Sequence, residues 1–194
     1  MPSKESSSSA AQEQPTRQPR NEPSQPTGSA MICLDWWDNL TGATDTKSRD
    51  SAQVAQLRRA KTVLEASLCP AYHHLIRRMP WLDVEVYADR MRLERLAVVA
   101  SVLSHVRHHL SDHPVSKLMG RPPAGKTTSL VSELRFRRLM QVRTNDDLIP
   151  ALRRTVDLLD KRVDVADLSN LIIWWGSPEK MKDIAFGYYS VAPD

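Results

Sequence analysis

Residues 132–176 read SELRFRRLMQVRTNDDLIPALRRTVDLLDKRVDVADLSNLIIWWG, and their apolar side chains recur every three or four positions. This spacing is typical of helices that bury one face. We expect amphipathic helices at 129–142 and 146–159, each with paired arginines on its polar side. A nearly apolar helix at 165–175 follows, and Gly176 is expected to cap its C-terminal end.

The same helical period continues in nearly every part of the chain after residue 30. Further helices are expected at 32–40, 51–66, 71–79, 84–110 and 178–189. The chain has only six glycines, and it lacks alternating β-branched runs. These patterns predict an all-α fold, a helical bundle of two small subdomains, at 31–111 and 129–194, joined by a basic Pro/Gly loop at 112–128.

Three predicted helix starts carry recognisable residues. Pro70 suits the first turn of a helix, where its missing N–H would have no partner. Asn145 is a plausible N-cap, because two acidic residues follow it and suit the positive end of a helix. Ser177, followed by proline and glutamate, has the expected order for the last helix.

The first 30 residues differ from the rest in composition. They are dominated by Ser, Pro, Gln and Glu and have almost no large apolar side chain, which predicts a disordered tail. Their positive and negative charges cancel. The formal net charge of +4 therefore belongs to the folded part of the chain.

Cellular location is constrained by what the sequence lacks. It has no apolar run long enough to span a bilayer and no secretory signal near its start, so we expect no membrane partner. Its two cysteines, Cys33 and Cys69, are too few for a disulfide framework. A reduced cytoplasmic compartment is the simplest interpretation.

Basic residues are concentrated between positions 117 and 154. This segment has three acidic residues, Glu133, Asp146 and Asp147, against nine basic ones: Lys117, Arg121, Lys126, Arg135, Arg137, Arg138, Arg143, Arg153 and Arg154. Arg137, Arg138 and Arg154 are expected to point away from the apolar stripes of their helices, whereas Arg153 flanks its stripe. If the two helices pack as a pair, these arginines share one surface with Lys126.

Two interpretations of this basic face remain open. Arginine binds phosphate through two parallel hydrogen bonds and stays charged, so several such contacts would hold a polyanion without reading its sequence. Alternatively, the arginines are solvated, and the protein is a helical adaptor that contacts only other proteins.

Residues 120–127, GRPPAGKT, match the nucleotide-binding pattern G-x-x-x-x-G-K-[ST] at every fixed position. In that alternative, Lys126 and Thr127 would serve the phosphates and Mg²⁺ of a nucleotide-hydrolysing enzyme. No apolar β-run precedes the motif, however, and its two prolines remove N–H donors from the phosphate cradle. A flexible basic loop that touches a phosphate backbone is the preferred interpretation.

Histidines and tryptophans offer weaker candidates. His105, His108, His109 and His113 could bind a metal together with Asp112, but spacing alone shows no closed ligand set, so no metal or cofactor is expected. Trp174 is expected in the core, and Trp175 is left as a possible interface residue. No catalytic nucleophile with a positioned base is evident, and we predict a non-catalytic protein.

An ordered series of short motifs resembles CasB, the small subunit of the type I-E CRISPR Cascade complex. The motifs are Trp37-x-x-Leu40, Leu57-Arg58-Arg59-Ala60, Pro70-Ala71-Tyr72-x-x-Leu75, Arg137-Arg138-Leu139-Met140 with Arg143, Leu152-Arg153-Arg154 and Trp174-Trp175-Gly176. They span the chain from about residue 34 to residue 190, and their order and spacing are more specific than any one of them.

The resemblance implies a non-catalytic subunit of a ribonucleoprotein for antiviral defence. Its partners would be guide RNA, target DNA, other Cascade subunits and a second copy of itself. It would line the path of the guide RNA–target duplex and hold the displaced strand of the R-loop, while base pairing reads the sequence. Contacts to the nucleic-acid backbone are expected, by motif match and from the basic face, at Arg58, Arg59, Lys126, Arg137, Arg138, Arg143, Arg153 and Arg154.

Overall fold

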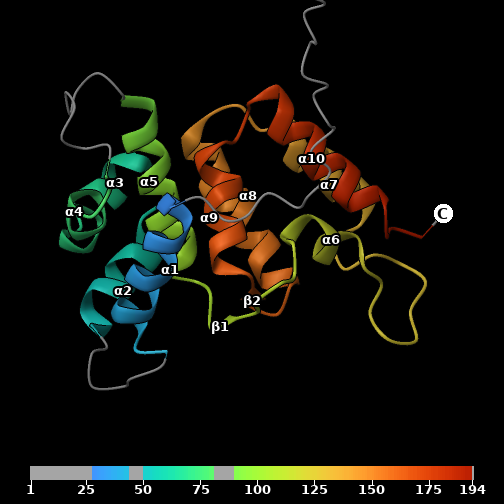
Figure 1. Ribbon diagram of the computed structural model, residues 1–194, viewed down its shortest axis with the longest axis horizontal. Coiled ribbons are helices and arrows are strands. Elements are labelled where there is room, and N and C mark those ends of the chain that lie inside the picture. Colours follow the sequence, from blue (N-terminus) through green and yellow to red (C-terminus); the bar gives the residue numbers. More distant parts are fainter. Residues whose placement is uncertain (1–27, 44–49, 81–89, 194) are drawn as a thin grey trace, which may run out of the picture.

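The computed structural model describes residues 28–43, 50–80 and 90–193, and helices make up nearly all of their regular secondary structure (Figure 1). The first helices are α1 (Gly28–Thr41), α2 (Ser51–Arg59), α3 (Val63–Ser67), α4 (Pro70–Arg77) and α5 (Arg90–Leu103). The later helices are α6 (Val115–Gly120), α7 (Glu133–Met140), α8 (Asn145–Leu158), α9 (Val165–Ile173) and α10 (Pro178–Tyr189). The predicted all-α fold class is confirmed.

The predicted tail, 1–30, lies mostly outside the described residues. Its last three positions, 28–30, belong to α1, which therefore begins before the expected residue 32. Within the described residues, no helix combines the length and the apolar character needed to cross a membrane.

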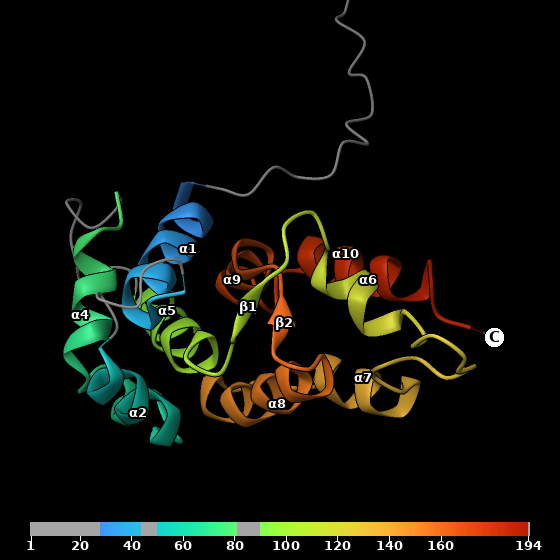
Figure 2. The ribbon, with the colours of Figure 1, turned by 90° about the horizontal axis from the view of Figure 1, so that it is seen from below.

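The core is centred on α5 and α9. From Arg95 to Leu103 every residue of α5 is buried, and such a helix has to be apolar nearly all round. Helix α9 packs against both α1 and α5, and α8 covers α5 from another side (Figures 1 and 2). The division into subdomains at 31–111 and 129–194 stays a prediction, since helices of both segments share this core.

Several of the expected helices are shorter than their apolar patterns suggest. The helix predicted at 129–142 spans only Glu133–Met140. The single helix predicted at 51–66 is wrong, because helix α2 ends at Arg59 and a separate helix, α3, begins at Val63. Thr62 caps α3 by accepting a hydrogen bond from the Glu65 amide at 3.2 Å. The helix predicted at 84–110 ends at Leu103. Beyond it the chain turns and forms β1 (His108–His109), a two-residue strand that pairs in parallel with β2 (Arg162–Val163).

The segment 112–128 is not loop throughout, since α6 lies within it. Helix α6 packs closely on α10, and the contact uses two glycines. A Cβ on Gly120 would overlap the Tyr188 carbonyl oxygen, and a Cβ on Gly187 would overlap the Ser116 hydroxyl. This packing fixes where the remaining loop, from residue 121, leaves the body.

The helix ends follow the sequence signals with two corrections. Pro70 begins α4 and Ser177 caps α10, as predicted. Gly176 has a positive φ of 86°, but it lies beyond the end of α9, whose C-cap is Trp174. The N-cap of α8 is Thr144, not Asn145. The Thr144 hydroxyl accepts a hydrogen bond from the Asp147 amide at 3.1 Å, while the Asn145 side chain donates to Glu94 at 2.8 Å.

Candidate nucleic-acid interface

Helices α7 and α8 follow one another along the lower edge of the molecule in Figure 2 and are in contact. Residues of both helices line a groove of ≈ 770 Å³. Arg135 and Arg138 reach this groove from α7, and Arg154 reaches it from α8. The other lining residues are Val131, Leu139, Val142, Asp147, Pro150, Ala151, Thr155, Asp157 and Leu158. The structure thus brings two residues of the predicted set, Arg138 and Arg154, to one groove.

The three groove arginines, Arg135, Arg138 and Arg154, are exposed. Among the residues that the structure describes, none of the three has a carboxylate within the 4.0 Å of an ion pair. Asp147 and Asp157 also line the groove and reduce its positive charge. Uncommitted guanidinium groups above an apolar floor suit a sugar-phosphate backbone, because each can donate two parallel hydrogen bonds to a phosphate.

Arg137 lies outside the groove lining, and it is engaged on another side of α7. Its Nη2 lies 2.7 Å from a carboxylate oxygen of Glu133, one turn earlier on the same helix. A hydrogen bond with Tyr189 of α10 and the Glu133 charge raise the pKa of Arg137. This exposed arginine therefore shares its charge with two neighbours, and the nucleic-acid contact expected of it stays a prediction.

Arg153 points into the molecule although its neighbour Arg154 is exposed. Its Nη2 donates to the Leu57 carbonyl at 2.7 Å and to the Ser101 hydroxyl at 2.5 Å. Burial lowers the pKa of Arg153. The side chain thereby joins α8 to both α2 and α5, which leaves it less free than Arg154 to reach a phosphate.

Arg58 and Arg59 lie at the C-terminal end of α2, close to the junction where Arg153 joins α8 to α2 and α5. Both are exposed, and the Arg58 Nε donates to the Ser104 carbonyl at 2.6 Å. His105 lies beside them, and burial together with the charge of Arg153 lowers its pKa to about 4. A neutral histidine here limits the positive charge that the junction has to accommodate.

Arg143 and Lys126 are exposed and belong to two different connections. Arg143 follows α7, whereas Lys126 lies in a turn whose Gly125 has a φ of 75°. The Lys126 amide donates to the Pro123 carbonyl at 3.0 Å, which closes that turn. Neither side chain lines the groove between α7 and α8.

The sequence 120–127 does not form a phosphate-binding loop. Such a loop joins a buried strand to the start of a helix. Here Gly120 is the last residue of α6, and the next helix, α7, begins only at Glu133. Gly120 serves the contact between α6 and α10 instead. The nucleotide-hydrolase alternative therefore has no structural support.

Two of the candidate histidines, His109 and His113, form hydrogen bonds with protein groups. His109 Nδ1 accepts from the Val165 amide at 3.1 Å, and its Nε2 lies 3.1 Å from the Ser111 hydroxyl. His113 Nδ1 lies 2.7 Å from the Ser111 carbonyl oxygen. In the described parts of the chain, no group of three His, Cys, Asp or Glu residues is arranged to hold a metal ion.

The positions expected for Trp174 and Trp175 are reversed. Trp174 is 44% exposed, whereas Trp175 is buried and donates from Nε1 to the Val142 carbonyl at 3.1 Å. The buried Arg95 in turn donates to the Trp175 carbonyl at 3.1 Å. The reason is that α9 ends at Ile173, so the two tryptophans lie on the turn beyond the helix and its apolar stripe does not place them.

Arg135 lines the groove, although it is not among the residues predicted from the sequence to contact nucleic acid. The missed signal was its spacing, because residues three apart on a helix share one side. Arg135 and Arg138 satisfy that rule, whereas Arg137 is paired with Glu133 four positions earlier.

A family model described as CRISPR-associated protein Cse2 matches residues 53–189, which is more than half of the chain. A search of curated protein sequences finds no match.

Two solved structures share the fold. A Cse2-family CRISPR-associated protein from Thermus thermophilus aligns with a TM-score of 0.60 and 22% identity, over 83% of this chain and 97% of that one. A chain in the crystal structure of E. coli Cascade bound to a PAM-containing dsDNA target aligns with a TM-score of 0.57 and 19% identity, over 83% of this chain and 94% of that one.

Proposed function

Because the chain belongs to the CRISPR-associated Cse2 family, we propose that it acts as the small subunit of a type I-E Cascade complex. This family is non-catalytic, as the sequence led us to expect. The proposed partners are guide RNA, target DNA, the other Cascade subunits and a second copy of the chain. The similar chain in E. coli Cascade comes from a complex bound to a dsDNA target, which supports this assignment. The proposed location is the cytoplasm.

The proposed task is to hold nucleic acid by its backbone and so to stabilise the R-loop. The supporting observation is the groove between α7 and α8, where Arg135, Arg138 and Arg154 are exposed and unpaired among the described residues. In an RNA-guided complex, base pairing reads the sequence and strand exchange is nearly balanced in free energy. Contacts to phosphates of the guide RNA–target duplex or of the displaced strand would shift that balance toward the open R-loop.

The other predicted contact residues differ in how well their positions suit this role. Arg59, Arg143 and Lys126 are exposed and remain proposed contacts outside the groove. Arg58 and Arg153 already donate hydrogen bonds to carbonyl oxygens of the protein. Among the residues predicted from the sequence, we therefore assign the largest share of backbone binding to Arg138 and Arg154.

The test is an Arg138→Ala/Arg154→Ala variant in the assembled complex, with labelled target DNA over a salt series. Affinity is expected to fall about tenfold, and the slope of log K against log salt is expected to become shallower by about one to two, because binding through fewer phosphate contacts releases fewer counterions. Arg77→Ala/Lys182→Ala removes two exposed charges elsewhere and is the matched control. Equal affinity and equal salt slope in the two variants would contradict the proposal.

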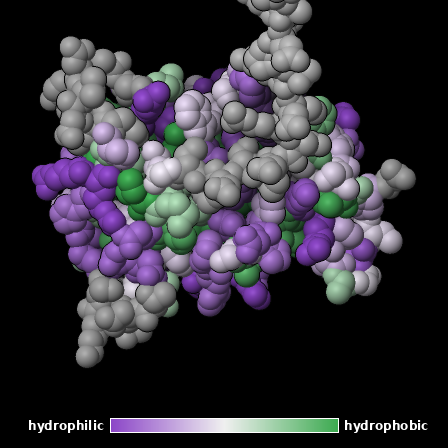
Figure 3. Space-filling view, viewed as in Figure 1, coloured by the Kyte–Doolittle hydropathy of each residue, from purple (hydrophilic) through white to green (hydrophobic). Residues whose placement is uncertain are grey.

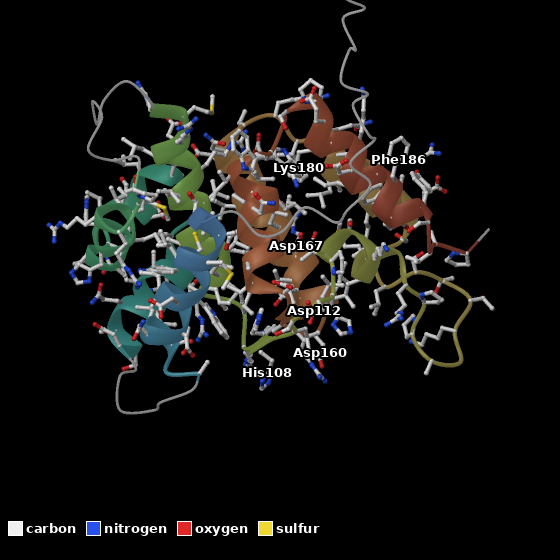
Figure 4. All side chains as sticks on the ribbon, viewed as in Figure 1. His108, Asp112, Asp160, Asp167, Lys180 and Phe186 are labelled. Carbon is white, nitrogen blue, oxygen red and sulfur yellow. The ribbon has the colours of Figure 1, made fainter. Side chains whose placement is uncertain are left out.

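The adaptor alternative is favoured by a different observation, the exposed aromatic side chains of α10. Phe186 is 73% exposed and projects from the outer side of that helix (Figure 4), and Tyr189 is 48% exposed. If the protein is an adaptor only, Phe186→Ser will reduce its incorporation into the complex, and the groove variant will leave DNA affinity unchanged.

A further inference from the structure

A second group of basic side chains lies on the two short strands, away from the groove between α7 and α8. The parallel register pairs His108 of β1 with Arg162 of β2, and both side chains are exposed. Paired strands lie about 4.8 Å apart, so register partners project side by side. The strands lie in the middle of the molecule when it is viewed from below, between the α1–α5 side and the α6–α10 side (Figure 2).

Arg107 extends this group by one residue and is fixed by the same backbone pairing. Its amide donates to the Lys161 carbonyl at 2.9 Å, the His108 amide donates to the same oxygen at 3.2 Å, and the Arg107 side chain is exposed. A cavity of ≈ 550 Å³ opens here, and its lining residues are Arg107, His108, His109, Leu110, Asp160 and Arg162. Its volume falls within the range of about 300–1,000 Å³ that is usual for ligand pockets.

Two of the nearby carboxylates already have other partners, and one remains beside the two arginines. Asp157 pairs with Lys161 at 3.6 Å, and Asp164 caps α9 by accepting from the Asp167 amide at 3.0 Å. Asp160 is the one acidic residue that lines the cavity (Figure 4). In the part of the chain that the structure describes, no ion pair involves Arg107 or Arg162.

The chemistry of this surface favours phosphate over a protein partner. Stable protein interfaces have an apolar centre that is depleted of charge. Here the lining has one aliphatic residue, Leu110, and none of the exposed large apolar side chains belongs to it. Hydrophilic residues dominate this lower edge of the molecule in Figure 3. Phosphodiester binding requires no apolar centre, because the guanidinium groups supply both charge and paired donors.

We propose that Arg107, His108 and Arg162 form a second nucleic-acid backbone site, separate from the groove between α7 and α8. This inference rests on the proposed function and extends it, because two separate sites allow one subunit to hold two segments of nucleic acid. The site takes phosphodiesters of either DNA or RNA and reads no bases. The strand pair fixes the backbone positions from which these side chains project.

The test uses the full chain in the assembled complex, with labelled target DNA and its displaced strand over a salt series. Arg107→Ala/Arg162→Ala is expected to lower affinity about tenfold and to make the salt slope shallower by about one to two. Arg107→Lys/Arg162→Lys keeps both charges and is expected to restore the slope. Arg77→Ala/Lys182→Ala again controls for the loss of two charges.

The possible results separate this site from the groove. If Arg107→Ala/Arg162→Ala matches the control while Arg138→Ala/Arg154→Ala weakens binding, the second site is wrong and the proposed function stands. If neither variant changes DNA affinity or salt slope, both are wrong. Normal DNA binding with reduced incorporation into the complex would overturn the phosphate site in favour of an acidic protein partner.

Discussion

Adjacent arginines on α8 have opposite environments, and the difference follows from one step along the helix. A residue advances about 100° around an α-helix, so Arg153 faces α2 and α5 while Arg154 faces the groove. Arg153 donates two hydrogen bonds within the protein, and Arg154 has no carboxylate partner among the described residues. The same residue type therefore supports stability at one position and is available for binding at the next.

Truncation of Arg153 should destabilise the fold, whereas truncation of Arg154 should not. Arg153→Ala leaves the Leu57 carbonyl and the Ser101 hydroxyl without their donor, which we expect to lower the free energy of unfolding by about 2 kcal/mol. Arg154→Ala removes an exposed side chain and should change it by less than about 0.5 kcal/mol. Urea unfolding of both variants checks this, and equal midpoints would contradict the structural role of Arg153.

At the scale of the helices, close packing of α6 on α10 depends on glycine at one position. A methyl group at residue 120 would overlap the Tyr188 carbonyl oxygen, which belongs to the backbone and cannot rotate away. Gly120→Ala should therefore separate the two helices and lower stability by about 2 kcal/mol, the usual scale of overpacking. Thermal unfolding measures this. Gly28→Ala is the control, because no atom lies within 4 Å of its added Cβ, and an equal melting temperature for both variants would refute the expectation.

Helices with a clear apolar stripe could be predicted from the sequence, and α7 to α10 are the examples. The break between α2 and α3 was missed because the apolar residues keep their period across it, and only the capping role of Thr62 separates the two helices. The strand pair was missed because two residues are too few to show an alternating pattern. Trp174 and Trp175 were placed wrongly because a helical stripe says nothing about residues beyond the helix end.

At the candidate site, too, features set by neighbouring residues could be predicted, whereas features set by contacts between distant residues could not. The basic character of α7 and α8 is evident from composition, and the three-residue spacing of Arg135 and Arg138 was available in the sequence. The inward direction of Arg153 could not be predicted from the sequence, because its two hydrogen-bond acceptors are distant along the chain. Leu57 lies 96 positions from Arg153, and Ser101 lies 52 positions from it. Contacts over such separations leave no local pattern in the sequence.

At the scale of the whole molecule, the junction between α2, α5 and α8 makes stability depend on pH. Burial and the charge of Arg153 lower the pKa of His105 to about 4, whereas an unfolded chain leaves it near 6.5. Between these two pKa values, His105 is protonated in the unfolded state and neutral in the folded state. The contribution of His105 to stability is therefore complete above about pH 6.5 and is lost as the pH falls toward 4.

His105→Gln should flatten this dependence, because the variant has no group to titrate at the junction. The measurement is the urea midpoint as the pH is lowered from about 7 to about 4, the interval set by the two pKa values. His73→Gln removes an exposed histidine on α4 and should keep the slope of the unaltered protein. If His105→Gln leaves the slope of urea midpoint against pH unchanged, His105 is not the group that makes stability depend on pH.

The packing of α1 against α9 also sets an order of events during synthesis. The buried face of α1, which includes Cys33 and Trp37, is completed by a helix that begins at Val165. Chains emerge from the ribosome N-terminal end first, and contacts between distant segments are slow to form. The first helix therefore leaves the ribosome long before its partner exists, so the native core can close only after α9 has been translated.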